Sequence, residues 1–206
     1  METFKKIAVG MGVIALLGLT GCQQSGISPS NLTQKAKEGQ EVVQLATKCK
    51  SGDTKSCVEI GKLYLNGEKV EKNYQKASLF FQTACGKGDT QGCLQLGEVY
   101  AKEKKYQKLV ELYQNLCNKK VGTACVKLGT LYENGEGVAK DAKKAMELYQ
   151  QGCDNGDGKG CLYLADIYSY GDIVPTDYPK ADKYRQKACK LGIKEACPTP
   201  VPKPKK

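Results

Sequence analysis

Ten of the eleven cysteines in this 206-residue chain recur in pairs at a nearly constant period. The members of each pair are eight residues apart, and successive pairs begin 36, 32, 36 and 36 residues after one another. The pairs are Cys49 and Cys57, Cys85 and Cys93, Cys117 and Cys125, Cys153 and Cys161, and Cys189 and Cys197. A fixed period of this length is typical of helical repeat arrays, in which stacked units share one continuous core.

The residues between the cysteine pairs predict two amphipathic helices per repeat. In each repeat a large apolar residue is followed by a small one and, three positions further on, by a tyrosine: Ile60, Gly61 and Tyr64; Leu96, Gly97 and Tyr100; Leu128, Gly129 and Tyr132; Leu164, Ala165 and Tyr168. After a break, each repeat has a second apolar run with one lysine at the equivalent position: Lys76, Lys108, Lys144 or Lys180. Apolar residues three and four apart indicate helices with one buried face. We therefore predict an all-α, tetratricopeptide-like α/α solenoid of about four helix pairs, termed helix A and helix B. We interpret the repeated tyrosines as packing residues and these lysines as exposed, solvated side chains.

The spacing within each cysteine pair requires the chain to reverse direction. On one helix, residues eight apart are separated by about 12 Å along the axis, whereas a disulfide needs Cα atoms about 4.4–6.8 Å apart. A helix-ending glycine and a helix-capping aspartate lie between the cysteines at Gly52-Asp53, Gly88-Asp89 and Gly156-Asp157. The third pair has the weaker stop Lys120-Val121-Gly122. We therefore predict five local disulfides, each joining the end of helix B to the first turn of the next helix A. Zinc-binding cysteines usually form CxxC pairs, which are absent here, so we predict no metal and no cofactor.

The N-terminus has the pattern of an export signal. Lys5 and Lys6 precede an apolar run over residues 7–19, which is several residues shorter than a membrane span. The following Leu19-Thr20-Gly21-Cys22 resembles the lipobox of bacterial lipoproteins. This resemblance implies that residues 1–21 are a signal peptide, that Cys22 is acylated, and that residues 22–32 form a lipidated flexible tether, with delivery to the outer membrane favoured. The alternative is an ordinary signal peptide followed by an unmodified cysteine.

The repeat sequence itself resembles a known family. Residues 128–141 (LGTLYENGEGVAKD), followed by Lys144-Ala145, Leu148-Tyr149 and Cys153, are similar to the SLR (Sel-one-like) repeat, a relative of the tetratricopeptide repeat. The added C-x7-C period resembles the Helicobacter cysteine-rich proteins. The resemblance covers residues 33–197, with repeats at about 49–84, 85–116, 117–152 and 153–188 and partial units on either side. The sequence departs from the family pattern in three places. The loop between Tyr100 and Tyr106 is four residues shorter, and residues 172–175 (DIVP) replace the usual Gly-x-Gly-Val loop. Pro198 directly follows Cys197 and prevents the last helix A from forming. Residues 198–206 are expected to form a disordered tail.

Composition limits the functions that the chain can perform. Histidine is absent, which excludes Ser-His and Cys-His catalytic pairs and His-containing zinc sites. The net charge is +10, yet Arg185 is the single arginine among 32 basic residues, a pattern that disfavours nucleic-acid recognition. The basic surface instead suggests an anionic partner.

The family resemblance implies a monomeric scaffold that binds a protein or peptide in a groove lined by helix A. The scaffold is expected in an oxidising compartment, either lipid-anchored to the cell envelope or released from it. The candidate groove residues are Glu59, Lys62, Gln95, Glu98, Lys127, Thr130, Tyr163 and Asp166.

The same resemblance implies an alternative from another class, a weak β-lactamase or penicillin-binding protein. Serine enzymes of that kind carry Ser-x-x-Lys, Ser-Asp-Asn and Lys-Thr-Gly, and none of the three motifs occurs in this chain. Zinc β-lactamases require histidine. We therefore predict no catalytic residue.

Overall fold

The computed structural model describes residues 29–198, and every regular element in this part of the chain is helical. The helices are α1 (Pro29–Lys50), α2 (Thr54–Asn66), α3 (Tyr74–Gly86), α4 (Thr90–Lys102), α5 (Tyr106–Asn118), α6 (Gly122–Asn134), α7 (Ala142–Asp154), α8 (Gly158–Tyr170), α9 (Tyr178–Lys190) and the 3-10 helix η1 (Lys194–Ala196). The A helices are α2, α4, α6 and α8, and the B helices are α3, α5, α7 and α9, with α1 in the place of a preceding helix B. The predicted all-α solenoid of helix pairs is confirmed.

The turns between helix B and the next helix A follow the predicted glycine-aspartate chemistry. Gly52, Gly88 and Gly156 have φ values of 112°, 86° and 87°, a left-handed conformation that glycine adopts without steric cost. The following aspartates each accept a hydrogen bond from a backbone N–H in the first turn of α2, α4 or α8. In the third turn Lys120 takes the left-handed conformation with φ of 63°, and Val121 provides no side-chain cap. Val121 packs against the apolar cluster of the neighbouring repeats instead.

Helices A and B of one repeat approach closely because a glycine faces an aromatic ring. A Cβ atom on Gly97 would lie 2.5 Å from the Tyr113 hydroxyl oxygen, and one on Gly129 would lie 2.7 Å from the Tyr149 ring. Gly61 and Phe81 make the same contact in the first repeat. The aromatic side chains are buried, so the small residue in helix A is a packing requirement.

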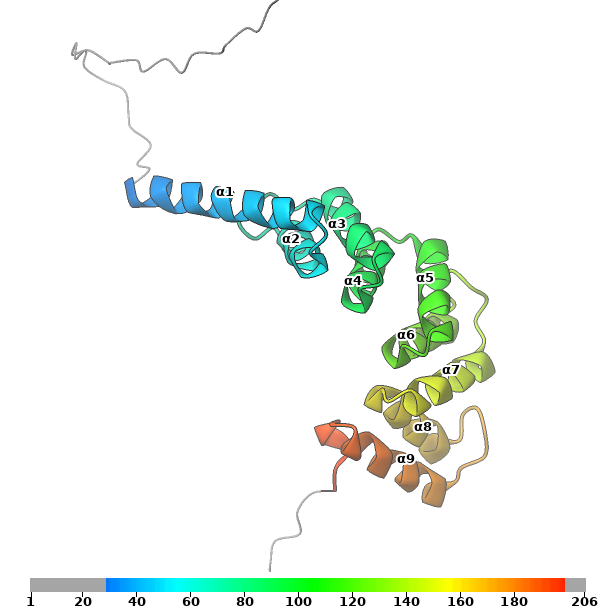
Figure 1. Ribbon diagram of the computed structural model, residues 1–206. Coiled ribbons are helices and arrows are strands. Elements are labelled where there is room, and N and C mark those ends of the chain that lie inside the picture. Colours follow the sequence, from blue (N-terminus) through cyan, green and yellow to red (C-terminus); the bar gives the residue numbers. More distant parts are fainter. Residues whose placement is uncertain (1–28, 199–206) are drawn as a thin grey trace, which may run out of the picture.

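The helix pairs stack in chain order into an arc (Figure 1). Each helix packs mainly on its neighbours in sequence, and the A helices α2 and α4, and α6 and α8, also contact one another. Among the described residues, the backbones of consecutive B helices lie farther apart, and these helices meet through side chains, such as Lys187 of α9 and Asp154 of α7. At these two junctions the A helices lie closer together than the B helices, and the arc curves toward the A helices there.

The ends and one loop depart from a regular array. Helix α1 is 22 residues long and begins at Pro29, so residues 29–32 lie in this helix rather than in the predicted tether. Only residues 103–105 separate α4 from α5, which agrees with the predicted short loop. The single turn η1 stands where the next helix A would be, as Pro198 after Cys197 predicts. The predicted signal peptide, Cys22 and most of the predicted tail lie outside the described residues.

Candidate functional site

The predicted cysteine pairs are all disulfide-bonded, and each bond clamps one turn between repeats. The Cα atoms of the paired cysteines lie 4.5 to 4.7 Å apart. Cys57, Cys125, Cys153 and Cys161 are fully buried, so these sulfur atoms belong to the core of the solenoid. The first four bonds each fix a helix A against the preceding helix and thereby fix which face of helix A is exposed.

The eight candidate groove residues lie on all four A helices, two on each. Glu59 and Lys62 of α2 are exposed, and Tyr163 of α8 is 38% exposed. The other five are half-buried: Gln95, Glu98, Lys127, Thr130 and Asp166. A mixture of polar residues that remain partly accessible is therefore present on every A helix.

A cavity of about 410 Å³ lies on this face between the first two A helices. Its walls include the predicted residues Glu59 and Lys62 of α2 and Asp89 at the start of α4, with Val58 as an apolar part of the lining. Both signs of charge are therefore present around a small apolar surface. Such a cavity can hold one side chain of an extended peptide and pair with its neighbours.

The third and fourth repeats bring two tyrosines and one glutamate together beside the A helices α6 and α8. The Tyr149 hydroxyl donates a 2.5 Å hydrogen bond to the Glu133 carboxylate at the end of α6. The Tyr149 ring lies 4.7 Å from the ring of the predicted groove residue Tyr163. Burial, together with the hydrogen bond to Glu133, raises the pKa of Tyr149, so this phenol stays a protonated donor. Sequence reasoning missed Glu133, because the other repeats have Leu65, Ala101 and Ser169 at this position.

The last repeat replaces the buried aromatic residue by a charged one. Arg185 occupies the position of Phe81, Tyr113 and Tyr149, and its guanidinium lies 4.0 Å from the carboxylate of the predicted groove residue Asp166. Burial raises the pKa of Asp166, and the Arg185 charge opposes this shift. The single arginine of the chain therefore has a partner within the solenoid.

The repeated tyrosines are packing residues, as predicted, and two of the repeated lysines contact them. Tyr64 stacks on Phe80 and Tyr168 stacks on Tyr184, both with ring centroids 5.8 Å apart. The Lys76 and Lys180 ammonium groups lie 5.1 and 4.1 Å from the Tyr64 and Tyr168 ring centroids. These lysines are exposed, yet they make cation–π contacts in addition to being solvated.

The described residues contain neither a candidate metal site nor a candidate membrane span. No group of three or more His, Cys, Asp or Glu side chains in residues 29–198 could hold a metal ion. Within the same range, no helix is both long and apolar enough to cross a bilayer.

The fold and the cystine pattern define the class of protein, an α/α solenoid with one disulfide at each junction between repeats. A sequence model of the Sel1 repeat matches residues 54–89, 122–157 and 158–193, slightly more than half of the chain. The chain therefore belongs to the Sel1 repeat family, in its cysteine-rich branch. The unmatched residues 90–121 are α4 and α5, the repeat with the shortened loop. Each predicted repeat begins at the first cysteine of a pair. The matched units begin five residues later, at the start of helix A.

Solved structures support this assignment. Helicobacter pylori cysteine rich protein B (hcpB) is 36% identical over 64% of this chain and 97% of its own, with a TM-score of 0.53. The protein c5321, a protective antigen of uropathogenic Escherichia coli with an SLR fold, is 28% identical over 76% of this chain with a TM-score of 0.65. This chain spans 34% of the c5321 chain, about a third of its length.

A Sel1 repeat protein from Oxalobacter formigenes shares the fold at 20% identity, with a TM-score of 0.63 over 82% of this chain and 78% of its own. The comparison with curated proteins gave no match.

Proposed function

We propose that this protein is an exported, lipid-anchored scaffold that binds an extended segment of a partner protein along its A-helix face. One observation carries the proposal: all four A helices present accessible polar side chains, and α2 with α4 and α6 with α8 contact one another directly. Solenoids that present stacked helices in this way are suited to extended partners. Sel1 repeats generally mediate protein–protein interaction.

The disulfides support both the binding mode and the location. Five bonds fix the repeat junctions, so little conformational entropy is lost from the scaffold when a partner binds. Disulfides in this number persist in oxidising compartments outside the cytosol. The lipobox-like segment ending at Cys22 supports anchoring of the exported chain to a membrane.

Site-specific photo-cross-linking tests the binding face. A photoreactive amino acid at Lys62, in the cavity between α2 and α4, is expected to form a discrete adduct with an envelope or extracellular protein. The matched control places the same amino acid at Asn115, an exposed residue of α5 on the B side. The purified partner is then expected to bind a Lys127→Glu variant about tenfold more weakly than the parent, because a charge on the face is reversed.

Two outcomes would overturn the proposal. Equal cross-linking from Lys62 and Asn115 would show that the A face is not selected. Turnover of a chromogenic cephalosporin by the folded, oxidised protein would identify an enzyme and support the β-lactamase alternative.

Replacement of the lipobox cysteine tests the anchor. In the Cys22→Ser variant no thiol is available for acylation, and the protein is expected to move from the detergent-phase membrane fraction to the soluble exported fraction. Metabolic labelling with a fatty-acid analogue should disappear in parallel, because stable anchoring needs about two acyl chains. An unchanged membrane fraction without label would show attachment by another means.

A further inference from the structure

The terminal helix α9 carries a row of lysines that the other B helices lack. Lys180, Lys183, Lys187 and Lys190 follow one another at steps of three, four and three residues, which places them on one face of the helix. The corresponding residues of α7 are Lys144, Glu147, Gln151 and Asp154, and those of α5 are Lys108, Glu111, Asn115 and Asn118. Only the first lysine is thus a feature of the repeat, and the other three are specific to the last one.

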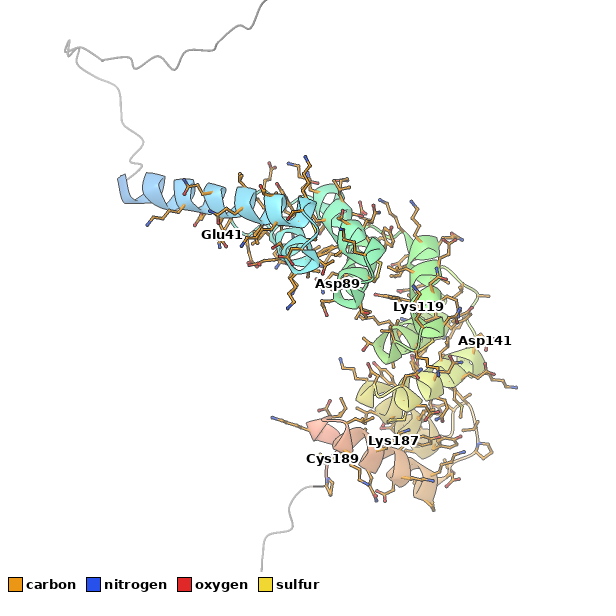
Figure 2. The ribbon with its side chains drawn as sticks, in the orientation of Figure 1. Glu41, Asp89, Lys119, Asp141, Lys187 and Cys189 are labelled. Atoms are coloured by element: carbon orange, nitrogen blue, oxygen red, sulfur yellow. A yellow bond between two sulfur atoms is a disulfide. The ribbon has the colours of Figure 1, made fainter. Side chains whose placement is uncertain are left out.

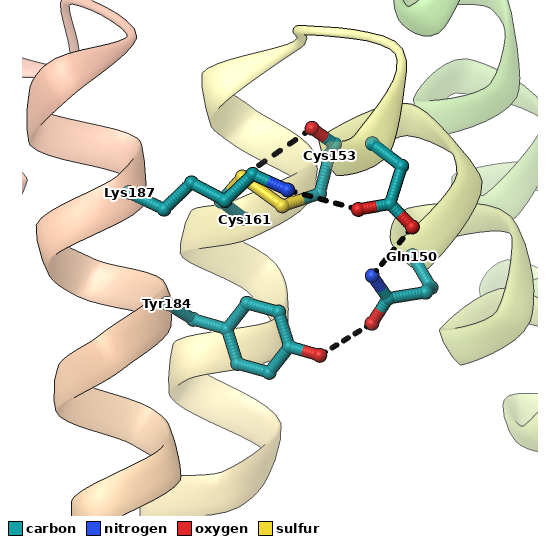
Figure 3. Close-up of polar contacts among 6 residues, drawn as sticks. Gln150, Cys153, Cys161, Tyr184 and Lys187 are labelled. Atoms are coloured by element: carbon teal, nitrogen blue, oxygen red, sulfur yellow. Dashed lines mark hydrogen bonds and ion pairs between the residues drawn. A yellow bond between two sulfur atoms is a disulfide. The ribbon is translucent and has the colours of Figure 1, made fainter.

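This row of lysines faces a cavity of about 610 Å³ between α7 and α9. Its wall is ordered by a chain of contacts (Figure 3): the Tyr184 hydroxyl donates to the Gln150 amide oxygen, the Gln150 amide donates to Asp154, and Lys187 pairs with Asp154 at 2.8 Å. The Tyr184 ring is itself stacked on Tyr168. These contacts fix the positions of the polar side chains that line the cavity. Figure 2 shows Lys187 on the terminal helix of the arc.

The cavity has an excess of positive charge. Asp154 is the one carboxylate among its lining residues, and Lys187 already neutralises it and lowers its pKa. Lys183 and Lys190 are exposed, and neither has a hydrogen-bond or ion-pair partner among the described residues. Unpaired ammonium groups around a concave surface attract carboxylates, and they do so without breaking an existing pair.

A second cavity of about 560 Å³ adjoins the first at Gln150, which lines both. Met146 of α7 and Ile173 and Val174 of the loop before α9 give this second cavity an apolar wall. Together the two cavities form a groove between α7 and α9, which we call the B groove. Helix α9 has 13 residues and is about 20 Å long, which matches about six residues of extended peptide.

We propose that the B groove binds an acidic peptide segment that has an apolar anchor residue at one end. Carboxylates of the segment pair with Lys183 and Lys190, and the anchor packs on Met146, Ile173 and Val174. The apolar end favours a peptide over a uniform polyanion such as a sulfated polysaccharide. Nucleic acid is disfavoured, because Arg185 pairs with Asp166 and the Tyr184 ring already stacks on Tyr168. This surface is separate from the A-helix face, so either proposal can fail without the other.

Fluorescence anisotropy with the purified, oxidised protein tests the basic end. The probe is a fluorescein-labelled synthetic peptide of alternating glutamate and serine with one leucine at an end. The Lys183→Glu/Lys190→Glu variant is expected to raise its Kd at least about tenfold. The control Lys108→Glu/Lys119→Glu, in α5 and directly after it, makes the same change in net charge at exposed positions and should alter the Kd less than about twofold, because distant charges are screened.

The apolar end is tested by pairing one variant with one change in the peptide. Val174→Ser is expected to weaken binding of the leucine-containing peptide about threefold to tenfold, and to leave a peptide with alanine in place of leucine unaffected. Unchanged thermal melts would show that the variants are folded. Equal losses in the control variant, no binding at low salt, or stronger binding of heparin than of the peptide would each overturn the proposal.

Discussion

Reduction of the five disulfides is expected to lower the melting temperature of this protein by tens of degrees. Each bond closes a loop of about nine residues, which stabilises by roughly 2–3 kcal/mol in the chain-entropy estimate. The bonds together thus contribute on the order of 10 kcal/mol, which is comparable to the whole stability of an ordinary domain. Circular dichroism melts of the oxidised protein and of the reduced, alkylated protein measure the difference. Equal melting temperatures would show that repeat stacking alone holds the fold.

Single bonds should differ according to their position. Cys117 and Cys125 are buried between the second and third repeats, whereas Cys189 and Cys197 are half-buried at the end of the array. The Cys117→Ala/Cys125→Ala variant is therefore expected to lose more stability than Cys189→Ala/Cys197→Ala. The reverse order would mean that the last turn, although terminal, nucleates or caps the stack. A non-reducing digest of the parent should yield linked pairs within single turns only.

The sequence predicted the fold best where the same residue types recur at the same position of each repeat. The eight-residue cysteine spacing predicts the turns, and Gly52-Asp53 and its equivalents predict where helices end and begin, because both depend on local backbone conformation. Proline is common at the first position of a helix, so Pro29 could have indicated that α1 begins there rather than at residue 33.

Features that depend on the relative position of two helices were not predictable in this way. The four lysines of α9 are visible in the sequence, but the cavity beside them exists because α7 and α9 both pack on α8 and meet each other through side chains. The hydrogen bond between Tyr149 and Glu133 likewise requires the position of the Tyr149 ring across Gly129. Neither depends on a residue pattern that recurs from repeat to repeat.

Addition of one methyl group at Gly129 is expected to destabilise the solenoid although alanine favours helix. The new Cβ would lie 2.7 Å from the Tyr149 ring and 3.2 Å from the Ala145 carbonyl oxygen. Tyr149 is 1% exposed and is held by Glu133 and Tyr163, so its ring cannot move aside without cost. We expect Gly129→Ala to cost about 1–3 kcal/mol of unfolding free energy, which chemical denaturation measures.

The fourth repeat supplies the reason to expect rescue of this variant. It has Ala165 in place of the glycine, and there the opposing residue is Arg185 rather than an aromatic residue. Tyr149→Leu, which removes the ring, should therefore be less harmful in the Gly129→Ala background than alone, giving a non-additive double-mutant cycle. Gly39→Ala is the control: a Cβ added at this position of α1 would have no neighbour within 4 Å, so the variant should be more stable by about 0.5–1 kcal/mol. Additive effects at positions 129 and 149 would mean that the cost of Gly129→Ala does not come from the ring, and that the glycine-aromatic contact does not set the spacing of helices A and B.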